Sequence, residues 1–176
     1  MQSLTPNLKV VGESVERVDG WEKVTGAAKF TDDIEFGPGL LYACIVESPH
    51  AYAKIKKIDT RRAQKVQGVV RVVTGKDFPF RFGLYMKDRY IFAQDRVRFV
   101  GEQVAAVIAR DPKTAARAAG LMKVEYEELS PIFDPVKAIS EGSDLIHPDL
   151  GGYIHVPWFF PKSGTNIAHW RKTKKG

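Results

Sequence analysis

The chain has 176 residues and a mass of 19.7 kDa, which supports one well-buried core but is short for two separate domains. Its composition, 44% hydrophobic and 27% charged, excludes a wholly disordered chain, and its single cysteine, Cys44, excludes an internal disulfide or an all-cysteine zinc site. No apolar run approaches the roughly 18 residues of a membrane span, and the N-terminus lacks the apolar region of a signal peptide. We therefore expect a cytoplasmic protein.

The net charge of +6 is concentrated at the C-terminal end of the chain. The last positions hold four of the 27 basic residues, namely Arg171, Lys172, Lys174 and Lys175, and the others nearly balance the 21 acidic residues. A second basic stretch, 54–62, alternates apolar and charged residues as a half-buried strand does, and no base-stacking aromatic residues interleave with it. The pattern indicates a solvated strand face and a basic tail, and it argues against a nucleic-acid partner.

The N-terminal part of the chain carries few signals of regular structure. Residues 1–12 show little periodicity and are interpreted as a leader. Residues 21–36 are polar and contain glycine, which predicts short extended pieces. The turn signal Gly-Pro-Gly at 37–39 then leads into a continuous apolar run, 40–46, of strand length. We expect this run to form a strand buried on both faces.

A strand–helix–strand unit follows. Residues 54–58 predict the first strand, and Asp59 or Thr60 caps a short helix. Gly68 stands where the end of that helix needs a left-handed residue, and 69–73 predict the returning strand.

A second unit of the same kind is predicted further along the chain. A strand over 103–109 is followed by Asp111 and Pro112, which are typical of an N-cap and a first helical position. Gly120 ends the helix, and 122–127 alternate as a strand. The helix carries a narrow apolar stripe of Ala115, Ala118 and Ala119, which indicates close packing of the helix against a sheet.

Two irregular segments carry many aromatic residues. The loop 75–89 is predicted to expose bulky rings at 78–82, and from Ser130 onward only 136–139 is expected to form a helical turn. Residues 153–160 are strongly aromatic without clear periodicity. We expect these segments to lie against another protein surface.

Catalytic motifs are absent from the sequence: it contains no P-loop, no G-x-G-x-x-G, no H-E-x-x-H and no G-x-S-x-G. Cys44 lies inside an apolar strand, which is typical of a structural core cysteine. The four histidines, His50, His147, His155 and His169, do not have a metal-ligand spacing. A weaker alternative is that His147, Asp144 and Asp149 gather a cation in one loop.

His50 and Glu102 are the remaining candidates for chemistry. His50 follows a predicted buried strand, where it either faces a cleft or satisfies loop carbonyls. Glu102 is a possible general base, although a lone glutamate at a strand edge is typical of a solvated side chain. The adjacent carboxylates at 32–33 and 127–128 diverge on an extended chain. No nucleophile, base and oxyanion site come together, so we assign no catalytic, cofactor-binding or metal residue.

An ordered series of short motifs resembles one known family. The motifs are GAAKFTDDI (26–34), GLLYA (39–43), SPHA (48–51), AKI (53–55), GV (68–69), VTGKD (73–77), VRFVGEQVAAV (97–107) and VEYEEL (124–129). Their order and spacing, from about residue 13 to 139, resemble the start of the molybdenum-binding subunit of the xanthine dehydrogenase and aldehyde oxidase family. Each motif alone is unspecific, whereas the ordered set is specific.

The resemblance implies an α+β fold of the α/β hammerhead type, with two strand–helix–strand units in a mixed sheet. It implies three segments: a leader at 1–12, the hammerhead domain at 13–140 and an extended linker at 141–176, toward a molybdopterin-binding domain that the chain lacks. By resemblance, the full enzyme hydroxylates an aldehyde or a nitrogen heterocycle with oxygen taken from water. Its electrons pass from molybdenum through two [2Fe-2S] clusters, usually to FAD on partner domains or subunits.

The matching positions are structural ones, since the catalytic glutamate and pterin-contacting loops of the family lie further along its chains. The first hypothesis is therefore a non-catalytic hammerhead part of a molybdenum hydroxylase, which works with a molybdopterin-binding large subunit and with iron–sulfur and FAD subunits. The alternative is a free-standing binding module that uses the basic tail to hold nucleic acid or an acidic partner. A third reading, a small enzyme that uses His50 and Glu102, has no supporting constellation.

Overall fold

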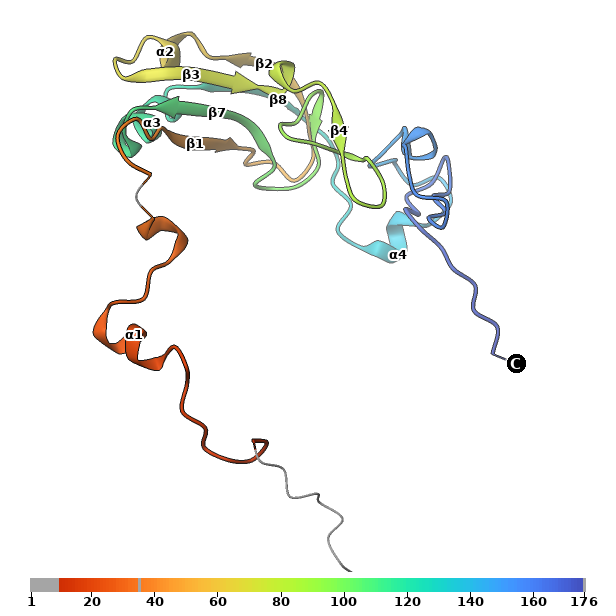
Figure 1. Ribbon diagram of the computed structural model, residues 1–176. Helices are drawn as coiled ribbons and strands as arrows, with labels where there is room; N and C mark the ends of the chain where they lie inside the picture. Colours follow the sequence, from red (N-terminus) through yellow and green to blue (C-terminus); the bar gives the residue numbers. More distant parts are fainter. Residues whose placement is uncertain (1–9, 35, 176) are drawn as a thin grey trace, which may run out of the picture. The chain divides into compact units, whose positions relative to one another are not determined.

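A computed structural model describes residues 10–34 and 36–175, which divide into two compact units, 1–40 and 41–176 (Figure 1). In the first unit the helix α1 (Gly20–Thr25) and the short 3-10 helix η1 (Thr31–Asp33) are the regular elements described. The expectation of extended pieces is wrong for α1. There the Lys23 ammonium lies 2.7 Å from the Asp19 carboxylate one turn earlier, and Gly26 ends the helix at φ +75°. Of the predicted leader, only 10–12 are described.

The second unit contains two three-stranded sheets and a two-stranded hairpin. The first sheet has the order β1 (Tyr42–Glu47), β7 (Gln103–Ala109), β3 (Val69–Thr74). The second has the order β6 (Arg96–Val97), β2 (Ala53–Asp59), β8 (Lys123–Glu128). The hairpin joins β4 (Arg81–Phe82) to β5 (Arg89–Tyr90), within the segment predicted to be a loop.

The predicted α+β fold class is confirmed, but the expected mixed sheet is not observed, because every strand pair described is antiparallel. The two strand–helix–strand units do form, and each links the two sheets. The first runs from β2 in one sheet to β3 in the other, and the second runs from β7 to β8. A unit whose strands lie in different sheets does not need the parallel pairing of a βαβ crossover.

Both predicted helices form, but the predicted ends hold fully only for the second. The N-cap of the first, Thr60, makes no side-chain cap hydrogen bond, and that helix ends at Gln64 with Lys65, not Gly68, at its C-cap. The helix α2 (Arg61–Gln64) follows Asp59, whose carboxylate accepts the backbone N–H of Arg61 at 3.1 Å. The helix α3 (Pro112–Ala119) begins after Asp111, whose carboxylate accepts the N–H of Thr114 at 2.8 Å. α3 packs on β1 and β7, and its Ala115 and Ala118 are fully buried, as the alanine stripe predicts.

The core divides into clusters around the central strand β7, which is buried on both faces. One cluster joins the two sheets, a second lies under the helices, and a third packs Phe92 and the half-buried Phe78 against β3 and β7. The run 40–46 is therefore corrected: its strand, β1, is an edge strand whose Tyr42 and Ile45 are each 39% exposed. Cys44 in this strand is half-buried and does not lie in the core.

The C-terminal segment has little regular structure, as expected. It holds α4 (Pro135–Ala138), which confirms the predicted helical turn, and the 3-10 helix η3 (Leu150–Gly152). A β-bridge between Met86 and His155 and a small buried cluster around Leu150 fasten the segment to the β4–β5 hairpin. In the part of the chain that the structure describes, no helix is long and apolar enough to cross a membrane.

Candidate functional site

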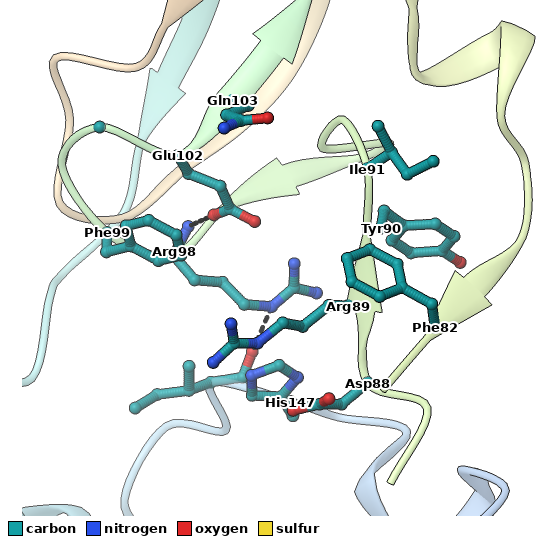
Figure 2. A pocket seen from close by; sticks show the side chains of 12 residues that line it. Phe82, Asp88, Arg89, Tyr90, Ile91, Arg98, Phe99, Glu102, Gln103 and His147 are labelled. Atoms are coloured by element: carbon teal, nitrogen blue, oxygen red, sulfur yellow. Dashed lines mark hydrogen bonds between the residues drawn. The ribbon is translucent and has the colours of Figure 1, made fainter. Parts of the chain in front are cut away.

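The turn that precedes β7 places Glu102 at the wall of a cavity (Figure 2). Gly101 adopts φ +87°, which favours glycine, and its N–H donates to the carbonyl of Ser48 at 2.8 Å. The N–H of Ser48 donates in return to the carbonyl of Glu102 at 2.9 Å. These reciprocal bonds fix the turn against the end of β1, so the position of Glu102 is set by the backbone.

Glu102 is half-buried, which differs from the solvated side chain expected from the sequence. Its carboxylate accepts a short hydrogen bond from the backbone N–H of Arg98. Burial raises the pKa of Glu102 because removal from water disfavours the charged form, while the Arg98 amide and guanidinium oppose this effect. The carboxylate is thus held by one defined donor.

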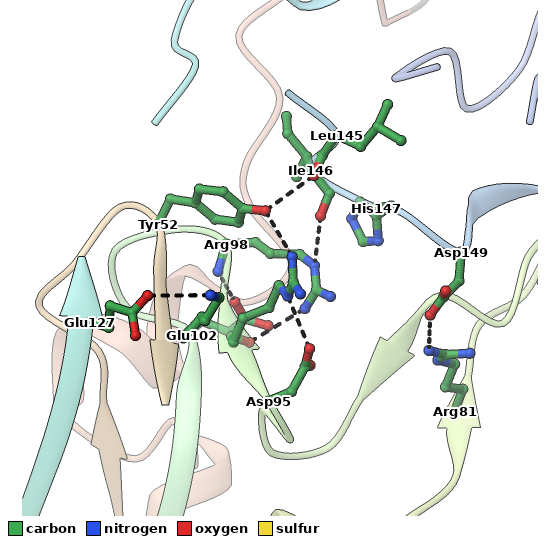
Figure 3. Close-up of polar contacts among 12 residues, drawn as sticks. Tyr52, Arg81, Asp95, Arg98, Glu102, Glu127, Leu145, Ile146, His147 and Asp149 are labelled. Carbon is green, nitrogen blue, oxygen red and sulfur yellow. Dashed lines mark hydrogen bonds and ion pairs between the residues drawn. The ribbon is translucent and has the colours of Figure 1, made fainter. Parts of the chain in front are cut away.

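Arg98 crosses from the same turn to the C-terminal segment. Its guanidinium donates to the carbonyl of Ile146 at 3.2 Å and to that of Arg96 at 3.4 Å. A parallel link runs through Tyr52, whose hydroxyl accepts from Arg96 at 3.1 Å. The same hydroxyl donates to the carbonyl of Leu145 at 3.1 Å (Figure 3). Two cationic side chains therefore fasten residues 145–146 to the second sheet.

His147 forms the opposite wall of the cavity. Its Nδ1 lies 3.1 Å from the Tyr153 hydroxyl, with the two rings edge to face. Burial lowers the pKa of His147, and the neighbouring Arg98 acts in the same direction, so both effects favour the neutral imidazole. A neutral histidine that is already hydrogen-bonded orients its neighbour Tyr153.

Arg81 stabilises the same region from the hairpin. Its guanidinium lies 4.6 Å from the ring centre of Tyr153 and 5.1 Å from that of Tyr90, in cation–π geometry. It also pairs with Asp149 at 3.2 Å (Figure 3). The hairpin and the C-terminal segment are thereby held together at the base of the cavity.

The cavity has a volume of about 500 Å³. Its lining is aromatic, aliphatic and ionic, with Phe82, Tyr90, Phe99, Ile91, Ile146, Asp88, Arg89, Arg98, Glu102, Gln103, Gly101 and His147 around it. The carboxylates of Asp88 and Glu102 and the imidazole of His147 lie among apolar side chains in this lining. The combination of apolar surface with a few fixed polar groups suits the cavity to binding.

The structure separates the other sequence candidates. The His50 Nδ1 lies 3.3 Å from the Glu128 carboxylate, so His50 is not paired with Glu102. Glu127 binds Lys54 at 3.2 Å and also Lys56, whereas Glu128 lies against His50, which confirms that these two carboxylates diverge. The pair at 32–33 lies in the 3-10 helix η1, so the expected extended chain is wrong there.

The proposed cation cluster does not form. Asp149 is paired with Arg81, and His147 is bonded to Tyr153. Among residues 10–34 and 36–175, no group of three His, Cys, Asp or Glu side chains is arranged to hold a metal ion.

Sequence reasoning missed Arg98, Arg81 and Tyr153. Arg98 reaches a carbonyl 48 residues away, and Arg81 reaches a carboxylate 68 residues away. No local pattern marks such contacts, because each depends on how the hairpin and the C-terminal segment meet. The sequence signal for these contacts is the density of aromatic residues in the hairpin and the C-terminal segment. It indicates that the two segments lie against apolar surface, but not which residues pair.

Comparisons with known proteins agree with the resemblance seen in the sequence. Residues 25–130 match the family described as "Aldehyde oxidase and xanthine dehydrogenase, a/b hammerhead domain". The chain is 40% identical over 145 residues to a probable xanthine dehydrogenase subunit of Bacillus subtilis (strain 168), covering 81% of this chain and 19% of that protein. It is 37% identical over 143 residues to the "Nicotinate dehydrogenase large molybdopterin subunit" of Eubacterium barkeri, covering 80% of this chain and 33% of that protein.

A solved structure shares the fold. Quinoline 2-oxidoreductase from Pseudomonas putida 86 matches with a TM-score of 0.67 and 33% sequence identity, over 77% of this chain and 18% of that chain. The chain therefore spans between about a fifth and a third of the length of these relatives.

Proposed function

The chain belongs to the aldehyde oxidase and xanthine dehydrogenase hammerhead family, and on that premise we propose that it is an assembly part of a molybdenum hydroxylase and carries none of the chemistry itself. The proposed extents are a leader at 1–12, the hammerhead domain at 13–140 and a linker at 141–176. The proposed partner is a molybdopterin-binding large subunit or domain, with iron–sulfur and FAD subunits beyond it.

The observation that carries this proposal is the amount of large apolar surface left open to solvent. Phe133 and Leu84 are each 82% exposed, Trp158 is 64% exposed, and Phe99 and Val100 form an exposed pair beside the cavity. A soluble domain rarely leaves so many large apolar side chains uncovered unless another protein surface covers them.

The residues described do not fit the family's cofactors. A [2Fe-2S] cluster needs four cysteine or histidine ligands close together, and this chain has one cysteine and no suitable cluster among residues 10–34 and 36–175. Molybdopterin carries a phosphate, which needs free N–H donors or cations. The N-terminus of α3 already carries the Asp111 carboxylate, and at the cavity wall the cations Arg89 and Arg98 are balanced by the carboxylates of Asp88 and Glu102. We therefore assign no cofactor ligand to this chain.

The proposed activity belongs to the complete enzyme. It hydroxylates an aldehyde or a nitrogen heterocycle with oxygen from water, and molybdopterin, [2Fe-2S] clusters and FAD reside on the partner chains or domains. The proposed location of this enzyme is the cytoplasm. The chain's own contribution is to hold those partners in place through its uncovered surfaces.

Dye reduction separates an assembly part from an enzyme. The purified 176-residue chain, free of molybdenum and iron, is mixed with benzaldehyde or nicotinate and an artificial electron acceptor. We expect no substrate-dependent reduction, whereas the molybdenum-containing assembly from the same cells reduces the dye with its own substrate. Substrate-dependent reduction by the metal-free chain would overturn the proposal.

A second candidate function is a binding module that uses the basic tail. The observation that favours it is that residues 171–175 are exposed and lie outside helices and strands. Deletion of residues 171–176 discriminates the two functions. A binding module would lose most of its affinity, and that affinity would fall steeply with salt in the full chain. An assembly part would still enter its complex.

A further inference from the structure

The β4–β5 hairpin and the C-terminal segment together form a ladder of stacked rings. Tyr85 stacks on Phe159 with ring centres 6.4 Å apart and planes within 9°. Phe159 stacks on His169 at 4.5 Å, and Phe160 stacks on the same imidazole at 5.9 Å. The backbone N–H of Phe160 donates to the His169 Nδ1 at 3.0 Å, which fixes the position of that ring.

Backbone hydrogen bonds hold the hairpin tip against this segment. The N–H of Val156 donates to the carbonyl of Tyr85 at 2.9 Å, and the N–H of Lys87 donates to the carbonyl of Ile154 at 2.8 Å. These bonds flank the bridge between Met86 and His155. The backbone of the ladder is thus already fixed by hydrogen bonds, so binding of a partner needs little further ordering of this surface and loses little conformational entropy.

An apolar hollow of about 630 Å³ lies beside the ladder. Most of its lining is apolar: Phe82, Gly83, Leu84, Tyr85, Met86, Phe159 and Ala168. Leu84 is 82% exposed, so its side chain contributes almost nothing to the stability of this chain. An open hollow with a protruding leucine has the form of an interface centre, where a partner's side chain is enclosed.

The two segments that form the ladder are mostly basic, although the hollow itself is lined by one acidic and one basic residue, Asp88 and Arg89. No acidic residue follows Asp149 in the sequence, whereas Lys162, Arg171, Lys172, Lys174 and Lys175 do. Within residues 10–34 and 36–175, no ion pair shorter than 4.0 Å involves the exposed Lys87, Arg89, Lys162, Arg171 or Lys172. Of the acidic residues, only Asp88 lines the hollow. These cations are therefore available to carboxylates on another protein.

We propose that this ladder surface, defined by Leu84, Tyr85, Arg89, Phe159 and the 169–172 segment, docks the molybdopterin-binding subunit or domain of the complex through an apolar side chain ringed by carboxylates. The apolar centre provides most of the affinity, and the charges select the partner and speed the encounter. This inference rests on the proposed function, because it names the surface by which the chain enters that assembly. The rings and cations together also fit a single-stranded nucleic acid, which the test below separates.

The first variant is Leu84→Asp in the protein within its own cells, with Val136→Asp as the matched control on α4. Both side chains are strongly exposed, so neither change disturbs the fold, and circular dichroism verifies this. We expect Leu84→Asp to lower the amount of chain recovered with molybdenum at least tenfold, and Val136→Asp to leave it unchanged. Equal recovery for Leu84→Asp and wild type overturns the docking surface.

The second variant replaces Arg89, Arg171 and Lys172 with glutamate. Salt weakens exposed ion pairs, so the wild-type assembly is expected to dissociate at least tenfold more at about 0.5 M than at about 0.1 M salt, while the variant shows a weak assembly at both concentrations. Salt-independent assembly of the wild type contradicts the charge argument. Co-purification with nucleic acid that nuclease treatment releases overturns the protein partner.

The molybdenum content of the wild-type sample separates a failure of the docking surface from a failure of the proposed assembly role. If it carries molybdenum and the Leu84→Asp variant assembles equally well, the docking surface is wrong and the proposed function stands. If the wild-type chain is found without molybdenum, both are wrong.

Discussion

Burial governs the chemistry of Glu102, whose carboxylate lies at a cavity wall with the backbone N–H of Arg98 as its donor. The pKa of this carboxyl is raised by burial, so the folded state binds its proton more tightly than the unfolded state does. The stabilising contribution of the group is therefore complete below the pKa of the unfolded chain and is lost as pH rises through the folded pKa. Ionisation of Glu102 therefore weakens the fold.

Glu102→Gln tests this sign directly. A glutamine oxygen still accepts from the Arg98 amide but carries no charge. Between about pH 4 and pH 7 we expect the free energy of unfolding of wild type, measured relative to Glu102→Gln, to decrease with pH. Urea denaturation of both proteins at several pH values measures this difference. A difference that is constant or increases with pH would show that burial does not dominate at Glu102.

At position 68 the backbone conformation, and not charge, is the reason that glycine is favoured. It adopts φ +93° between α2 and β3, and an added Cβ would lie 3.3 Å from the Thr114 methyl. Gly68→Ala is expected to destabilise the fold by roughly 1–2 kcal/mol, because a side chain is strained in the left-handed region. Gly120→Ala is the control, since Gly120 has φ −64° and an added Cβ there makes only ordinary contacts. Thermal unfolding should separate the two variants, and equal midpoints would refute the strain argument.

At the scale of elements, α3 shows what close helix–sheet packing requires. Ala118 is fully buried against Ala63 and Val107, whereas Ala116 on the same helix is exposed. Ala118→Leu is expected to cost roughly 1–3 kcal/mol through overpacking, and Ala116→Leu to leave stability within about 0.5 kcal/mol of wild type. Chemical denaturation measures both. If Ala118→Leu is as stable as wild type, the helix has room to move away from the sheet.

In the irregular C-terminal segment, the side chain of Asn166 holds separate stretches of backbone together by hydrogen bonds. Its amide oxygen accepts the N–H of Ile146 at 2.9 Å, and its amide nitrogen donates to the carbonyls of Ala138 and Asp144, both at 2.9 Å. Asn166→Ala removes all three bonds, so we expect faster hydrogen exchange at the Ile146 amide. Thr165→Ala is the control, because the Thr165 hydroxyl bonds only within its own turn. Unchanged exchange in Asn166→Ala would show that other contacts order the segment.

Elements whose signals are local could be predicted from the sequence. The N-cap at Asp111, the strand 103–109 and the turn at 136–139 each depend on residues within a few positions. The placement of β1 at a sheet edge could not be predicted, because a continuous apolar run of residues does not distinguish an edge strand from a central strand. The cavity around Glu102 could not be predicted from the sequence either, because its wall depends on contact between Arg98 and Ile146, which are 48 residues apart in the chain.

At the scale of the whole molecule, the second unit has a small core and extensive uncovered apolar surface. The chain spans only a fifth to a third of the relatives described above, and under the proposed assembly role a partner covers this surface. The order of the family motifs made the family predictable from the sequence. The aromatic segments that form the proposed docking surface could be identified from the sequence, but their arrangement could not, because the hairpin and the C-terminal segment combine only in the folded chain.

The most direct test of the assembly role is native mass spectrometry of the endogenous protein, combined with molybdenum and iron analysis of the same sample. The account predicts that this sequence is found within a larger assembly that contains both molybdenum and iron. The 19.7 kDa chain found alone and free of both metals would contradict it.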